Sequence, residues 1–170
     1  MSKQLIDQIY NYYLILQDSV RVVREVNNEQ SNHLFRNTIF SYQTHEDDIS
    51  NAVDELEGLM IVSMFAAFER WLRDTVLTKS EILLTVIPDE FGKELFALAS
   101  NEIERWRTKE IIRLFTFVSK DSSMKMIQIT DYRNWIAHGK SKEKLPSIKT
   151  DIQTVYQTVR VFMEDVERVL

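Results

Sequence analysis

The stretch that most constrains the fold of this chain covers residues 52–77 and reads AVDELEGLMIVSMFAAFERWLRDTVL. Its apolar side chains recur every three or four residues, which is the period of one face of an α-helix. The preceding THEDDIS places acidic residues where they suit the positive end of a helix, so we expect one long helix ending near Lys79. Because this helix is so apolar, it should form the centre of a bundle, with Met64, Phe65, Phe68 and Trp71 in the core.

Helical patterns cover most of the remaining chain. A first helix is predicted from Leu5 to Val26, fading at the polar run NNEQSN, and Pro88 precedes a short helix. Two further helical segments read TKEIIRLFTFVS and SSMKMIQITDYRNWIAHG, the second ended by Gly139 in the position of a left-handed C-cap. An amphipathic closing helix, SIKTDIQTVYQTVRVFMEDVERVL, follows Pro146.

The fold class follows from these segments and from the scarcity of turn residues. Only three glycines and two prolines occur in 170 residues, which leaves little material for β-hairpins. We therefore predict an all-α fold: an up-and-down helical bundle with four main helices plus short extra helices, forming a single domain over residues 1–170. The stretch from His33 to Tyr42 fits a short helix or an ordered loop equally well, and the role of segment 29–48 stays open.

The composition excludes several classes of function. The absence of cysteine rules out disulfides, thiol nucleophiles and cysteine zinc sites. The amino terminus lacks the unbroken apolar core of a signal peptide and no run reaches the length of a membrane span, so we expect a cytoplasmic protein with no membrane partner. A net charge of −5 argues against non-specific coating of nucleic acid, although a local basic groove is compatible with it.

No metal or cofactor site is predicted. The sequence contains no phosphate loop, dinucleotide fingerprint, nucleophile elbow or zinc-protease helix. His45, Glu46, Asp47 and Asp48 are consecutive, and consecutive side chains of a helix point in different directions, so a solvated first turn explains them better than a metal site. His33 has no evident partner.

The string RNWIAHG, residues 133–139, is the strongest candidate for a functional motif. An arginine and a histidine at this spacing arise by chance in roughly 0.2 pairs per chain of this composition, but the full string is much rarer. At about 100° per residue, Ile129 and Tyr132 belong to the core-facing stripe of the helix, Arg133 flanks that stripe, and Asn134 and His138 share a more open face.

In an all-α chain of this size, RNWIAHG near the end of a penultimate long helix resembles the signature of the HEPN superfamily, Arg-x4-6-His with a polar residue after the arginine. The resemblance implies a metal-independent ribonuclease, a toxin or phage-defence effector, with Arg133, Asn134 and His138 as catalytic residues and no cofactor. Lys140 stands where the subgroup paired with nucleotidyltransferase antitoxins usually has a tyrosine. The closer likeness is therefore to the stand-alone nuclease branch.

The expected reaction is cleavage of RNA by its own 2′-hydroxyl. His138 would act as general acid or base, Arg133 would stabilise charge on the phosphate, and Asn134 would orient the histidine or the scissile group. The resemblance also implies a homodimer in which the two motifs face each other across a two-fold axis. Independently, one arginine and one histidine on a convex bundle offer no enclosed pocket, whereas two copies would form a cleft.

Supporting residues are expected around this motif. A partly desolvated guanidinium favours an acidic neighbour, and Glu69, beside the apolar stripe of the central helix, is the candidate to hold Arg133. Trp135 and three lysines of the following loop are candidates for RNA binding, namely Lys140, Lys142 and Lys144. The lysines also fit an ordinary solvated loop.

A second interpretation assigns no catalysis to the motif. Arg133 would then be a structural ion-pair partner and His138 a helix cap, in an interaction module that binds a protein or a nucleotide as an antitoxin or regulatory subunit. The acidic pI of about 5.3 favours this interpretation, since a free ribonuclease gains from a basic surface. The sequence leaves open the RNA target, any antitoxin or regulator, and the pathway.

Overall fold

A computed structural model of the protein describes residues 2–28, 46–143 and 145–170. These residues form helices and connecting loops with no β-strand among them, which confirms the predicted all-α class. His33–Tyr42 and His45 lie outside the described residues. No helix of the described ranges combines the length and apolar character needed to cross a membrane.

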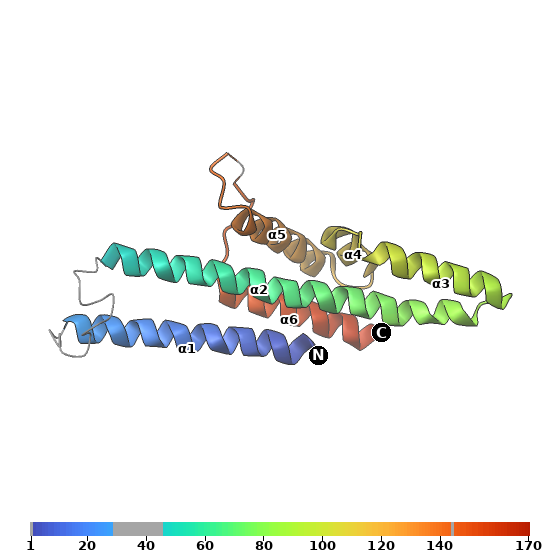
Figure 1. The fold of residues 1–170 in the computed structure, drawn as a ribbon, viewed down its shortest axis with the longest axis horizontal. Coiled ribbons are helices and arrows are strands. Elements are labelled where there is room, and N and C mark those ends of the chain that lie inside the picture. The colour runs from blue at the N-terminus through green and yellow to red at the C-terminus, as the bar shows by residue number, and fades with distance from the viewer. Residues whose placement is uncertain (1, 29–45, 144) are drawn as a thin grey trace.

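From residue 46 to residue 137 the helices are joined by short connections, and a longer connection leads from there to the last helix (Figure 1). The first two long helices run antiparallel, and the last helix ends near the start of the first. The elements are α1 (Ser2–Asn28), α2 (Glu46–Ser80), the 3-10 helix η3 (Glu81–Thr85), α3 (Asp89–Ile103), α4 (Thr108–Leu114), α5 (Lys120–Ala137) and α6 (Ile152–Val169).

Helix α2 is the centre of the molecule, as its apolar sequence predicted, and it contacts each of the other elements. Ile61, Phe65, Phe68 and Leu72 form a continuous stripe with at most 1% of each residue exposed. The ring of Phe162 on α6 meets Phe68 edge to face at 5.7 Å. Each such side chain contributes about 1.5–3 kcal/mol by leaving water, so this stripe ties α2 to α5 and α6.

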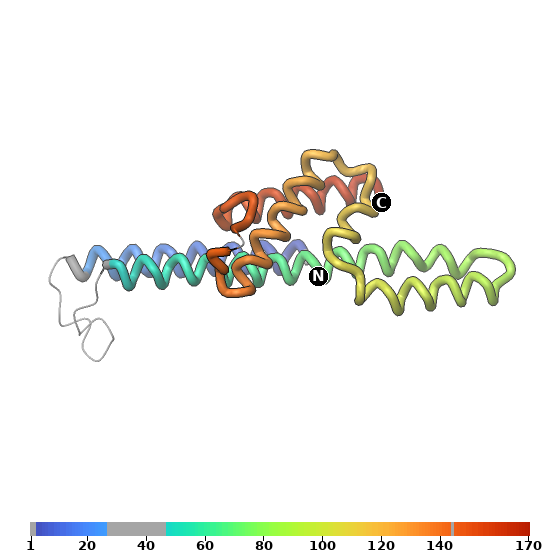
Figure 2. Tube along the Cα trace, turned by 90° about the horizontal axis from the view of Figure 1, so that it is seen from above, coloured from blue at the N-terminus to red at the C-terminus, as the bar shows by residue number. Residues whose placement is uncertain are grey.

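The carboxyl-terminal part of α2 continues beyond the bundle and, with η3 and α3, forms a projecting helical arm (Figure 2). Helix α3 begins at Asp89, directly after Pro88, as predicted, but is longer than the short helix expected there. Phe91 and Leu98 are exposed, and the arm lies outside the main core cluster. Helical spacing of apolar residues thus predicted this helix correctly without predicting burial of its apolar face.

The end of α5 is built by a glycine-terminated cap. Gly139 has φ +78°, its N–H donates to the carbonyl of Ile136 at 3.1 Å, and the N–H of Lys140 donates to the carbonyl of Trp135 at 2.9 Å. This pair of bonds is the Schellman pattern, which satisfies the last carbonyls of a helix. The predicted C-cap at Gly139 is therefore confirmed, and it holds His138 at the helix end.

Candidate functional site

Arg133 on α5 is held by a bonded network that reaches across to α2. Its Nη2 donates to Glu69 Oε2 at 2.8 Å, and its Nη1 donates to Asn134 Oδ1 at 2.9 Å. The guanidinium also lies over the ring of Phe65, 5.6 Å from the ring centroid. The predicted pairing of Glu69 with Arg133 is present, whereas a role of either residue in catalysis stays a prediction.

The carboxylate of Glu69 is itself fully engaged. Its second oxygen, Oε1, accepts a hydrogen bond from the hydroxyl of Thr108, a buried residue in the first turn of α4. The side chains of Arg133 and Glu69 are only 22% and 16% exposed, so water screens their attraction little. One carboxylate thus joins α2, α4 and α5, and contacts within the chain fix Arg133 in place.

His138 occupies a very different environment at the other end of the motif. It is the exposed C-cap residue of α5, and its N–H donates to the carbonyl of Asn134 at 3.0 Å. His138 and Asn134 line a shared cavity of about 370 Å³, which Trp135 and Pro146 also line. We call this space the motif cavity.

The motif cavity contains few uncompensated charges. Asp131 lines it, but the carboxylate pairs with Lys109 of α4 at 2.5 Å. Arg133 does not belong to the cavity lining; it is linked to the cavity through Asn134, whose Oδ1 accepts from Arg133. The structure therefore brings Asn134 and His138 together directly and Arg133 to them only through this amide.

The predicted RNA-binding residues are divided among different environments. Trp135 is partly buried, and its indole N–H donates to the carbonyl of Ser141 at 2.8 Å. Lys140 pairs with Glu55 of α2 at 2.5 Å, so its charge is largely compensated within the chain. Lys142 is exposed, and Lys144 lies outside the described residues. Of the three lysines, Lys142 alone is described as an exposed side chain of the loop.

No group of three or more histidine, aspartate or glutamate side chains in the described ranges is arranged to hold a metal ion. Asp47 and Asp48 lie in the first turn of α2 with exposed side chains, as predicted for a solvated helix start.

Sequence reasoning missed two residues of this site, Thr108 and Asp131. Thr108 lies 39 positions from Glu69, and nothing in its local sequence indicates that α4 packs against both α2 and α5. Asp131 is near RNWIAHG, and its spacing from Asn134 places it on the same helical face, so the period of the helix alone could have identified it.

Comparison with models of known protein families, with curated proteins and with solved structures found no match to this chain. The likeness to the HEPN superfamily therefore rests on RNWIAHG and on the order of the helices.

Proposed function

We propose that this protein is a metal-independent endoribonuclease that cleaves RNA through the substrate 2′-hydroxyl, acting as a toxin or phage-defence effector. The observation that carries the proposal is the position of Asn134. Asn134 lines the motif cavity together with His138, and its Oδ1 accepts a hydrogen bond from Arg133, so Asn134 adjoins both other residues of the motif. A phosphate near Asn134 would lie close to the imidazole of His138 and to the partly buried guanidinium of Arg133.

The proposed step is an in-line displacement at phosphorus. The 2′-oxygen forms a bond to the adjacent phosphorus, and its proton passes to a base; the bond to the 5′-oxygen breaks, and that oxygen takes up a proton. His138 serves as the acid or the base, and Arg133 stabilises charge on the phosphate oxygens. The products are a 2′,3′-cyclic phosphate and a 5′-hydroxyl end.

We further propose that the active form is a homodimer in which two RNWIAHG segments face each other. One chain supplies a single motif histidine, whereas two chains would supply one imidazole as base and one as acid. The exposed position of His138 at a helix end is compatible with such a facing arrangement. A stable interface of this kind needs about 1,000 Å² or more of buried surface.

The test is incubation of the purified protein with mixed cellular RNA in excess EDTA, beside light scattering over a dilution series. We expect cleavage with cyclic-phosphate ends and a loss of at least about 100-fold in rate for His138→Ala. His33→Ala, a histidine outside the motif, is the matched control. Equal cleavage by wild type and His138→Ala would overturn the proposal, and full specific activity in a monomer would overturn the two-chain site.

A second candidate function is favoured by one specific observation. Both terminal nitrogens of Arg133 are already bonded within the chain, to Glu69 and to Asn134, as expected of a structural ion pair. In that case the protein is a non-catalytic interaction module, an antitoxin or a regulatory or nucleotide-binding subunit. Expression in cells separates the two: toxicity relieved by Arg133→Ala favours the nuclease, and harmless expression of both forms favours the module.

A further inference from the structure

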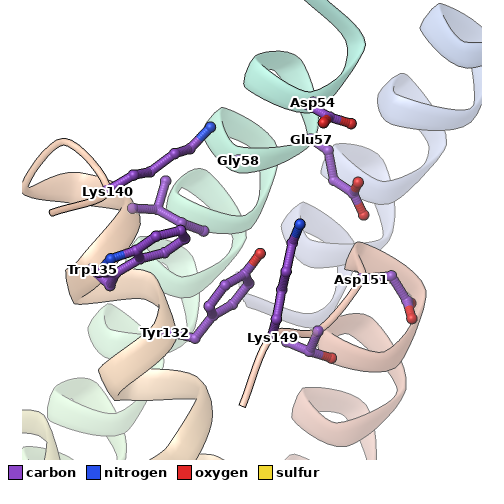
Figure 3. Close-up of a pocket in the computed structure, with 10 residues that line it drawn as sticks. Asp54, Glu57, Gly58, Tyr132, Trp135, Lys140, Lys149 and Asp151 are labelled. Carbon is purple, nitrogen blue, oxygen red and sulfur yellow. The ribbon is translucent and has the colours of Figure 1, made fainter. Parts of the chain in front are cut away.

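A second cavity, of about 370 Å³, lies between α2, α5 and the start of α6 (Figure 3). Tyr132 points into it, and we call it the tyrosine cavity. Tyr132 is only 6% exposed, yet its hydroxyl makes no hydrogen bond within the ranges that the structure describes. The hydroxyl oxygen itself is not sealed in the core: it opens into the cavity, where a ligand can reach it. This hydroxyl is therefore positioned to bond a molecule that occupies the cavity.

Carboxylates dominate the charge around the hydroxyl. Asp54 and Glu57 come from α2, and Asp151 stands at the amino-terminal cap of α6 (Figure 3). One oxygen of Glu57, Oε1, accepts from the N–H of Ile152 at 2.8 Å, while Asp54 has no ion pair in the described part of the chain. The pKa of the Tyr132 phenol is raised, first by burial and then by the charges of Glu57, Asp54 and Asp151. Carboxylates near the hydroxyl favour a positively charged group beside it.

Two lysines also line the tyrosine cavity, but the net charge of its lining stays negative. Lys140 is already compensated by Glu55, which lies outside the lining. Lys149 is exposed, extends into the cavity, and forms no ion pair with a described residue (Figure 3). Both oxygens of Asp151 accept hydrogen bonds from Thr154. Even without this carboxylate, Asp54 and Glu57 outnumber the one uncompensated ammonium, and the excess of negative charge disfavours phosphates and other anions.

The walls suit a flat or extended group that carries positive charge. The rings of Tyr132 and Trp135 are stacked with centroids 5.8 Å apart at 20°, and aromatic faces attract cations. Gly58 allows α2 to approach α5 here, since a Cβ at this position would lie 3.2 Å from Ile136 Cγ2. A space of this size accommodates a small molecule.

We propose that the tyrosine cavity binds a small organic cation with a primary ammonium or guanidinium group. The Tyr132 hydroxyl oxygen accepts a hydrogen bond from the cation, and Glu57 and Asp54 balance its charge. Lys149 lies in the same space as a competing cation, which the ligand displaces. The site is separate from the motif cavity, although Trp135 borders both.

The test is calorimetric titration of the full chain with putrescine, agmatine and arginine amide, with inorganic phosphate as the anionic probe. We expect at least one of the cations to bind and Tyr132→Phe, which keeps the ring, to weaken binding about tenfold. Tyr12→Phe, at an exposed position of α1, is the matched control and should leave binding unchanged. No binding of any cation, or equal binding by Tyr132→Phe, would overturn the proposal.

Charge substitutions provide a test of sign. Asp54→Asn should weaken cation binding about threefold, and Lys149→Gln should strengthen it by a similar factor. Asp48→Asn, elsewhere on α2, is the control and should leave cation binding unchanged. Opposite signs, or phosphate binding in place of cation binding, would overturn the proposal. Tyr132→Phe is expected to cleave RNA like wild type. Loss of cation binding with RNA cleavage unchanged therefore tests this proposal alone, and absence of RNA cleavage by the wild type tests the ribonuclease proposal alone.

Discussion

The two ends of RNWIAHG are held in opposite ways. Arg133 is mostly buried and is fixed by Glu69 from α2, by Asn134 and by the ring of Phe65. His138 is exposed, and the bonds that position it are backbone bonds of the α5 terminus. Tertiary packing thus determines where the arginine lies, whereas the local end of one helix determines where the histidine lies.

Arg133 is therefore held rigidly, whereas His138 is accessible from solvent. The partly buried guanidinium of Arg133 is held by bonds to Glu69 and Asn134, so its position is rigid. The imidazole of His138 is exposed at the helix end and lines the motif cavity. We therefore expect substitutions at the arginine end to lower the free energy of unfolding, and substitutions at the histidine end chiefly to affect activity.

The largest expected effect on stability is that of Arg133→Ala. Removing the guanidinium leaves Glu69 poorly hydrated and without its charge partner, so we expect a loss of about 2 kcal/mol in the free energy of unfolding. Urea denaturation followed by circular dichroism measures it. Arg168→Ala is the control, because Arg168 is 76% exposed in its pair with Asp165 and should cost under about 0.5 kcal/mol.

A double-mutant cycle with Glu69→Ala sharpens this prediction. The combined loss should be smaller than the sum of the single losses, since the second substitution removes the carboxylate that the first leaves unpaired. Additive losses would show that Arg133 and Glu69 are not coupled, and that their ion pair does not stabilise the fold.

An intermediate effect is expected for Gly139→Ala. The φ of +78° is unfavourable for alanine, and no atom lies within 4 Å of the added Cβ, so the cost comes from the backbone alone. We expect a loss of about 1 kcal/mol in the free energy of unfolding, and a smaller loss for Gly139→Asn, because asparagine tolerates this conformation better. Thermal and urea unfolding of the two variants check the order, and a neutral Gly139→Ala would contradict it.

The smallest effect on stability is expected for His138→Ala. The side chain is exposed and has no side-chain hydrogen bond in the described part of the chain, so the free energy of unfolding should change by less than about 0.5 kcal/mol. The same urea experiment measures it. A loss as large as that of Arg133→Ala would make His138 a structural residue and remove the contrast between the two ends.

The candidate site could be predicted in part because some of it depends on local patterns. Helical periodicity placed Glu69 on the flank of the buried stripe of α2 and Arg133 on the flank of the stripe of α5, and these flanks meet. The left-handed cap at Gly139 was predictable because few residues other than glycine adopt that backbone conformation easily. The ion pair between Lys140 and Glu55 could not be predicted, because the two residues are 85 positions apart in the sequence.

The sequence by itself determined the helical class, the long central helix and the end of α5, because the spacing of apolar residues and the choice of a glycine act within a few residues along the chain. Only the tertiary structure decided that Thr108 completes the carboxylate of Glu69, that α3 projects from the bundle, and that Tyr132 faces a cavity lined by carboxylates of α2 and α6. Those outcomes depend on the angles at which helices distant in sequence cross. Packing across the whole core determines these angles, and no local sequence pattern specifies them.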